Sequence, residues 1–186
     1  MQVAALTVKA QGILRTLYTD AGLSPAKFTQ GEAKVSPPAK WGLRAIWDTG
    51  ASGSAVSIQV ADGLGFKPIG YTPVSTANGD FVAPVYICDI YLPSGVVVPS
   101  VEMTGGKLGS DADMLIGMDV IALGDFTITN LGGVTWFTFR VPSMQRADYS
   151  VMPKPNGDDR CPCGTTKKYK NCCKPIAQKH LAAAFK

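Results

Sequence analysis

Residues 45–51 read Ala45-Ile46-Trp47-Asp48-Thr49-Gly50-Ala51, an apolar run that leads into a carboxylate and a glycine. The apolar run predicts a buried strand, and Gly50 permits a tight backbone turn beside Asp48. The next segment, Ser54 to Leu64, has a composition typical of a helix. We therefore expect a strand, a tight loop that carries a carboxylate, and then a short helix.

A second apolar stretch with a glycine lies further along the chain, in the run Met114-Leu115-Ile116-Gly117-Met118-Asp119-Val120-Ile121. Between the two stretches, residues 74–86 predict a hairpin with Ala77-Asn78-Gly79-Asp80 at its centre. Asn-Gly between apolar segments is a strong hairpin signal, because both residues tolerate positive φ. A surface hairpin with no role in a site is the alternative interpretation of this turn alone.

The order of these parts resembles that of retroviral-type aspartic peptidases (retropepsins), and their bacterial representatives in particular. The resemblance covers about residues 10–141. It implies a mainly β fold, a closed barrel-like acid protease domain with one short helix. By the same resemblance, Asp48, Thr49 and Gly50 are the catalytic residues. The residues expected to bind substrate are Ala51, Ala77, Asn78, Gly79, Asp80, Ile116 and Gly117.

Hydrolysis of a peptide bond without a metal or a nucleophilic side chain needs two carboxyl groups, one as base and one as acid. Two close aspartates share one proton and titrate as a pair. The sequence holds one Asp-Thr-Gly, and the other acidic sites read Asn78-Gly79-Asp80, Asp111-Ala112-Asp113 and Gly124-Asp125. Asp48 of a second copy is therefore expected to complete the site in a homodimer, with Thr49 hydroxyls holding the two loops together.

Three positions near the loop differ from related peptidases. Retroviral enzymes place an ion pair where this chain has Ser52 and Met118, so both charges are absent and neither is left buried alone. The strength of the dimer then depends on other contacts. Two-lobed aspartic peptidases commonly carry Ser or Thr where this chain has Ala51. Fewer hydrogen bonds to the charged pair favour activity near neutral pH rather than at acidic pH.

Other catalytic classes lack the residues that they need. His180 is the only histidine and lies in the basic C-terminal segment, so the main domain has no base for a Ser-His or Cys-His arrangement. A histidine-ligated catalytic zinc is excluded for the same reason. The sequence contains neither a Walker-type phosphate loop nor a convincing dinucleotide fingerprint.

Four of the 5 cysteines are close in sequence, namely Cys161, Cys163, Cys172 and Cys173. Four thiolates suit tetrahedral zinc, whereas disulfides between such close cysteines are strained. The segment closely resembles the SEC-C motif, which has Cys-x-Cys-Gly, then lysines with an aromatic residue, and then Cys-Cys. We therefore expect a structural Zn²⁺ without an open coordination position. The resemblance further implies docking to a protein partner. The remaining cysteine, Cys88, is expected in the core.

Residues 142–159 contain Pro142, Pro153, Pro155 and the turn signal Asn156-Gly157, and they are interpreted as a linker. The expected organisation is a peptidase domain over residues 1–141 and a zinc module with a short tail over residues 160–186. From Lys154 onward eight basic residues outnumber two acidic ones, a net charge of +6, whereas residues 1–153 sum to −2. The positive charge of this module has two interpretations. It predicts contact with an acidic protein, a ribosome or nucleic acid, or it is only a solvated surface that balances the negative charge of the metal centre.

The composition, with 46% hydrophobic residues, 20 Gly and 13 Pro, suits a β-rich domain with many turns. Strands are predicted at residues 45–47, 82–92, 96–103, 126–130 and 134–141, with one or two more in residues 2–19, and a short helix in residues 175–186. No segment reaches the roughly 18 apolar residues that span a bilayer, and no basic region precedes the N-terminal apolar stretch. We therefore expect a cytoplasmic protein without membrane contact.

A non-catalytic protein is the chief alternative. Such a dimer would keep the fold, bind peptides or only dimerise, and dock to a partner through the zinc module. The intact Asp48-Thr49-Gly50 favours the peptidase, whereas Ser52 and Met118 slightly favour the adaptor. A zinc module that acts on nucleic acid is a third interpretation, and it predicts strongly salt-dependent binding.

Overall fold

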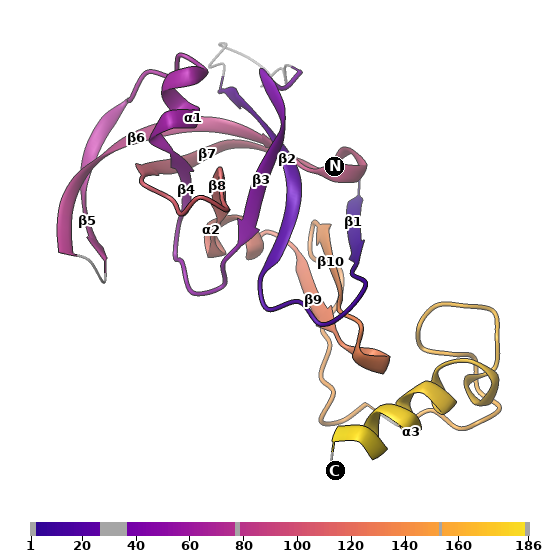
Figure 1. The fold of residues 1–186 in the computed structure, drawn as a ribbon. Coiled ribbons are helices and arrows are strands. Elements are labelled where there is room, and N and C mark those ends of the chain that lie inside the picture. The colour runs from indigo at the N-terminus through magenta and orange to yellow at the C-terminus, as the bar shows by residue number, and fades with distance from the viewer. Residues whose placement is uncertain (1–2, 27–36, 77–78, 153, 185–186) are drawn as a thin grey trace.

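The computed structural model describes residues 3–26, 37–76, 79–152 and 154–184 (Figure 1). The strands are β1 (Ala4–Lys9), β2 (Leu17–Pro25), β3 (Lys40–Trp47), β4 (Ser54–Ser57), β5 (Gly70–Thr76), β6 (Gly79–Tyr91), β7 (Val97–Gly106), β8 (Met114–Ile116), β9 (Asp125–Thr129) and β10 (Trp136–Val141). The helices are α1 (Ile58–Gly63), α2 (Met118–Ile121) and α3 (Cys173–Ala184), and the short 3-10 turns are η1 (Pro93–Gly95), η2 (Leu131–Gly133) and η3 (Tyr169–Asn171). The mainly β fold expected from the sequence is confirmed.

The larger sheet has the strand order β2-β3-β8-β4-β7-β6-β5, and β2 pairs with β6 as well as with β3. The first half of β2 lies against β3, with Leu17 opposite Trp47, and its second half lies against β6, with Gly22 opposite Tyr91. The sheet therefore curls round and closes on itself. A smaller sheet of order β1-β10-β9 lies beside it.

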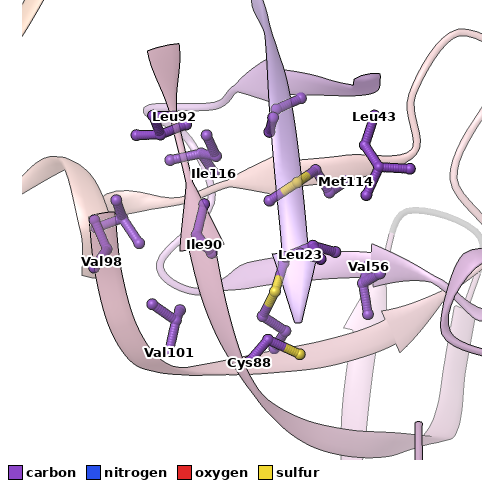
Figure 2. Packing of buried hydrophobic residues seen from close by; sticks show 14 of the residues in the cluster. Leu23, Leu43, Val56, Cys88, Ile90, Leu92, Val98, Val101, Met114 and Ile116 are labelled. Atoms are coloured by element: carbon purple, nitrogen blue, oxygen red, sulfur yellow. The ribbon is translucent and has the colours of Figure 1, made fainter. Parts of the chain in front are cut away.

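The core fills the inside of the closed sheet, and Figure 2 shows side chains of β2, β3, β4, β6, β7 and β8 meeting there. Cys88 is one of these buried residues, as the sequence predicts. Trp47 connects this core to the smaller sheet, because its ring contacts those of Phe126, Phe137 and Phe139 at centroid distances of 5.5, 5.9 and 5.0 Å. Aromatic pairs at such distances are favourable beyond the area they bury. The end of β3 is therefore held by both sheets.

Most of the predicted strands are confirmed, and two lie within or just beyond residues 2–19, as β1 and β2. The prediction of a helix from Ser54 to Leu64 was wrong in its first part. Residues 54–57 form β4, which pairs with β7 on one side and β8 on the other, and only residues 58–63 are helical. Pairing on both sides overrides the local preference for a helix.

The hairpin predicted over residues 74–86 is the β5–β6 pair, in which Thr76 lies opposite Gly79. Two of its predicted substrate-binding residues, Ala77 and Asn78, lie outside the described residues. Towards the C-terminus, residues 142–152 and 154–159 contain neither helix nor strand. This is the segment predicted to be the linker, and the domain boundaries stay a prediction. Among the described residues, no helix is long and apolar enough to cross a membrane.

Candidate active site and metal centre

The Asp48 loop begins where β3 ends. The Asp48 N–H donates to the carbonyl oxygen of Ile116 at 2.9 Å, which fixes the start of the loop. The Gly50 N–H donates to Oδ1 of Asp48 at 2.9 Å, and the Ala51 N–H donates to the Asp48 carbonyl at 3.3 Å. Asp48 is half-buried, while Thr49 and Gly50 are exposed. The tight loop therefore holds its carboxylate at the protein surface.

Strand β8 lies directly behind this loop. It runs parallel to β3, with Trp47 opposite Ile116, and antiparallel to β4, with Ala55 opposite Leu115. Beyond β8, the Met118 N–H donates to the Ala51 carbonyl at 2.8 Å. The Asp119 N–H donates to the Ser52 carbonyl at 3.2 Å. Ser52 and Met118 stand where retroviral enzymes have an ion pair. Here the segments that carry these two residues are joined by backbone hydrogen bonds instead.

Gly117 allows the two segments to approach this closely. A Cβ at this position would lie 2.5 Å from both the carbonyl carbon and the oxygen of Gly53. Such a distance is not compatible with a side chain unless the backbone shifts. Gly117 is therefore needed for the close approach of the loop and the start of α2.

Asp119 and Ser54 form a hydrogen-bond network that sequence reasoning missed. Asp119 accepts the Ser54 N–H at 3.0 Å on Oδ2, and the Ser54 hydroxyl at 2.8 Å and the Val120 N–H at 2.9 Å on Oδ1. The Ser54 hydroxyl oxygen in turn accepts the Gly117 N–H at 3.1 Å. The one signal in the sequence is Asp119 itself, an acidic residue in the first turn of α2, where a negative charge stabilises the unpaired N–H groups of the helix.

The structure brings six of the predicted site residues together, namely Asp48, Thr49, Gly50, Ala51, Ile116 and Gly117. Gly79 and Asp80 lie elsewhere, at the start of β6. Figure 1 shows the β5–β6 hairpin extending to one side of the loop that follows β3. Within one chain the hairpin residues and the Asp48 loop are therefore separate parts of the candidate site.

The carboxylates on segments next to the loop have structural roles. Asp113 accepts the Arg44 N–H at 2.8 Å, and Asp119 holds Ser54 as described above. Each carboxylate thus accepts hydrogen bonds from backbone N–H groups of a neighbouring segment. Among the described residues, Asp48 is the carboxylate that the tight loop presents outward.

The four clustered cysteines lie close together in space as well as in sequence. The Sγ atoms of Cys161, Cys163, Cys172 and Cys173 all lie within 4.8 Å of one another. Cys172 Sγ is 3.6 Å from Cys163 Sγ and 3.9 Å from Cys173 Sγ. A tetrahedral zinc with Zn–S bonds of about 2.3 Å places its sulfur atoms about 3.8 Å apart. The four thiols therefore fit a tetrahedral zinc ion, and they are too far apart for disulfides.

The surroundings of the thiols differ. Hydrogen bonds from the Thr165 hydroxyl and backbone lower the pKa of Cys163 to about 6, which favours the thiolate that binds metal. Burial, together with hydrogen bonds among the cysteines, raises the pKa of Cys173. Burial also raises the pKa of Cys88 to about 12, in agreement with a core thiol that does not react.

Charged side chains order the segment around the cysteines. Oδ1 of Asp158 forms ion pairs with the ammonium groups of Lys168 and Lys170, and each Nζ lies 2.9 Å from this oxygen. The pKa of Asp158 is lowered by these hydrogen bonds. The Arg160 and Lys168 backbones also form an isolated bridge. These contacts close the loop that carries the first two cysteines.

Comparisons with known proteins agree with both sites. The aspartyl protease family model matches residues 40–120, and the SEC-C motif model matches residues 159–175. Among solved structures, a retropepsin-like aspartic protease from Rickettsia conorii is 19% identical with a TM-score of 0.50, over 75% of this chain and 96% of that chain. No curated protein matches this chain.

Two other solved structures are more distant. The simian foamy virus (mac) protease is 18% identical with a TM-score of 0.37, over 57% of this chain and 92% of that chain. The retroviral protease-like domain of Ddi1 from Leishmania major is 15% identical with a TM-score of 0.33, over 75% of this chain and 100% of that chain. The chain thus has a retropepsin-like fold, an aspartyl protease family match that contains its Asp48 loop, and an SEC-C motif that contains its four clustered cysteines.

Proposed function

We propose that this protein is an aspartic endopeptidase that hydrolyses peptide bonds as a homodimer. The observation that supports it best is the Asp48 loop, in which a tight turn presents one carboxylate at the surface of a retropepsin-like fold. One such loop supplies half of a two-carboxylate site. A second copy supplies the other Asp48, and the exposed Thr49 of each loop contacts its counterpart.

In this mechanism the two Asp48 carboxyl groups hold one water molecule and share one proton. The ionised carboxylate takes a proton from the water as its oxygen attacks the carbonyl carbon of the peptide bond. The protonated carboxyl group donates its proton to the carbonyl oxygen, which gives a neutral tetrahedral diol. The diol then collapses with proton transfer to the leaving amine, and no covalent bond forms between enzyme and substrate.

The proposed substrate is a peptide or a protein segment in extended conformation. The β5–β6 hairpin would close over it, with Gly79 and Asp80 near the closing end. Tyr71 and Val82 lie on the same face of this hairpin and have exposed side chains, which suit contact with the side chains of a bound peptide. Ala51, which is half-buried, would line the floor of the same site, and the buried Ile116 and Gly117 would support that floor from below.

The four cysteines are proposed to hold a structural Zn²⁺. With four protein ligands the ion has no open coordination position, so it stabilises the fold of the module and does not enter the reaction. The basic surface of the module, which includes Lys167 and Lys174, is proposed to recruit a protein substrate or partner, or a ribosome or nucleic acid. The 5 cysteines are all free, which suits a reducing compartment such as the cytoplasm.

Cleavage of a diverse peptide library, followed by mass spectrometry at several pH values, tests this function. We expect the parent protein to cut a defined subset of peptides and the Asp48→Asn variant to cut none. Asp111→Asn is the matched control, because Asp111 is exposed in the segment between β7 and β8. No cleavage by a folded, dimeric parent protein would contradict the proposal.

A non-catalytic dimeric adaptor that docks through its zinc module is the second candidate. Ser52 and Met118 favour it, because they replace the ion pair that supports the retroviral dimer, and both are exposed in one chain. The library experiment separates the two candidates. The adaptor would retain peptides without cutting them, and Asp48→Asn would retain them equally well.

A further inference from the structure

The metal centre and the last helix share a residue. Cys173 is one of the four clustered cysteines and also the first residue of α3. A helix of 12 residues is marginally stable on its own in water. A bound metal would fix the position of Cys173 and so the start of the helix.

The same helix touches the main domain at the turn η2. Helix α3 and η2 are in contact, and Figure 1 shows them side by side below β9 and β10. A Cβ at Gly132 would lie 2.6 Å from Cγ2 of Ile176, so the two residues pack as closely as a glycine allows. Gly132 also has a φ of 70°, a conformation that favours glycine.

The turn η2 joins two strands that contact the residue before Asp48. Strands β9 and β10 pair antiparallel from Trp136 opposite Thr129 to Arg140 opposite Asp125. Their rings Phe126, Phe137 and Phe139 pack around Trp47, as described above. A change in the order of this hairpin would therefore reach Trp47 through direct contacts.

Trp47 in turn fixes the beginning of the Asp48 loop. Its side chain is 4% exposed, and its Nε1–H donates to Oγ1 of Thr19 at 3.2 Å. It lies opposite Ile116, whose carbonyl oxygen accepts the Asp48 N–H. A chain of direct contacts thus connects the cysteines to Asp48. Helix α3 contacts η2, the β9–β10 hairpin contacts Trp47, and β3 pairs with β8.

We infer that the metal centre controls the order of the Asp48 loop, through α3, η2 and the β9–β10 hairpin. With metal bound, α3 is anchored at Cys173 and Ile176 holds η2. Without metal, the helix loses its anchor, and the hairpin and Trp47 become more mobile. This makes the C-terminal module a metal-dependent support of the Asp48 loop. The inference concerns order and not turnover, so it holds or fails independently of the proposed peptidase activity.

Hydrogen exchange followed by mass spectrometry on the full chain tests the inference. We compare zinc-loaded protein, with its metal content measured, with protein treated with a chelator. Amides of residues 125–141 and 45–51 should exchange about fivefold faster or more after metal removal, the lower end of typical coupling between sites. Amides of residues 85–90 in β6 serve as the internal control and should not change.

Ile176→Ser tests the path. Ile176 is 46% exposed, so the variant should keep its fold and its metal, yet its residues 125–141 should exchange rapidly even with metal bound. The matched control is Leu181→Ser, since Leu181 lies on the same helix and is 60% exposed. It should respond to metal as the parent does.

Three results would overturn the inference. One is a chain that binds no zinc when its thiols are reduced. Another is metal removal that alters exchange only within residues 160–184. The third is an Ile176→Ser variant whose residues 125–141 still respond to metal as the parent does. The first two use the parent protein, so they decide the question even if a variant fails to fold.

Discussion

The hydroxyl of Ser54 donates a hydrogen bond to Oδ1 of Asp119 at 2.8 Å, and this contact joins the segment after the Asp48 loop to the start of α2. Ser54 is 1% exposed, and its hydroxyl oxygen also accepts the Gly117 N–H. The loop and α2 are thus held together by a buried serine, at the place where the retroviral ion pair is missing.

Ser54→Ala is expected to weaken this connection. The variant leaves the buried Gly117 N–H without this partner and removes one hydrogen bond to the exposed Asp119, which costs about 1–3 kcal/mol of the free energy of unfolding. Urea denaturation measures the difference. Ser57→Ala, on the half-buried position at the other end of β4, is the control and should change stability by about 0.5 kcal/mol or less. Equal free energies of unfolding for Ser54→Ala and the control would show that the hydrogen bonds of Ser54 do not stabilise the fold.

Metal binding is expected to depend on the clustered cysteines alone. The purified protein should contain one zinc per chain by elemental analysis, and Cys172→Ser should lose most of it because the ion then lacks a thiolate. Cys88→Ala is the matched control, since Cys88 is buried in the core and lies outside the cluster. It should keep its zinc. Zinc that persists unchanged in Cys172→Ser would contradict the assignment of the ligands.

Asp125 is expected to make stability depend on acid pH. The Ser143 hydroxyl, the Met144 N–H and the Arg140 guanidinium hold the pKa of Asp125 well below its usual range. A lowered pKa in the folded state adds stability above the unfolded value of about 3.9, and this stability is lost as pH falls through the folded value. Asp125→Asn should therefore melt at a lower temperature than the parent at pH 7.

The difference between Asp125→Asn and the parent should shrink as the pH falls below about 4, because Asp125 of the unfolded parent then takes up a proton that the folded parent binds only at a lower pH. Thermal melts at a series of pH values measure it. A difference in melting temperature that stays constant from pH 7 to pH 3 would mean that the ionised carboxylate is not the source of the stability.

Activity is expected to be highest near neutral pH. Ala51 supplies no hydroxyl to the charged form of the carboxyl pair, so the shared proton is held more firmly. Ala51→Ser should restore that donor and move the pH–rate profile to lower pH. Profiles of kcat/KM against pH for both proteins test this. A parent profile that peaks well below pH 4 would show that the reasoning from Ala51 is wrong.

Local patterns in the sequence predicted the parts of the fold that depend on local chemistry. The apolar run before Asp48 and the glycine at position 50 are enough to predict a strand and a tight turn. The spacing of the cysteines predicts their clustering, because the first and last pairs are each close in sequence. The structure confirms these elements.

The features that sequence reasoning missed depend on contacts between distant segments. Residues 54–57 were predicted to be helical, and they form a strand because β7 and β8 lie on either side. Asp119 meets Ser54 across 65 positions in the sequence, and no local pattern predicts that pair. The contact of Ile176 with Gly132 likewise appears only after the hairpin and α3 are placed in space.

A subunit-mixing experiment tests the central claim most directly, that two chains share one site through their Asp48 residues. Parent protein is mixed with increasing fractions of Asp48→Asn at constant total protein concentration, exchange of chains is verified by mass spectrometry, and peptide cleavage is measured. If each site needs both Asp48 residues, activity should fall with the square of the parent fraction, while mixing with Asp111→Asn should leave it unchanged. Activity that falls in direct proportion to the parent fraction would mean that one chain carries a complete site, and it would contradict the shared dyad.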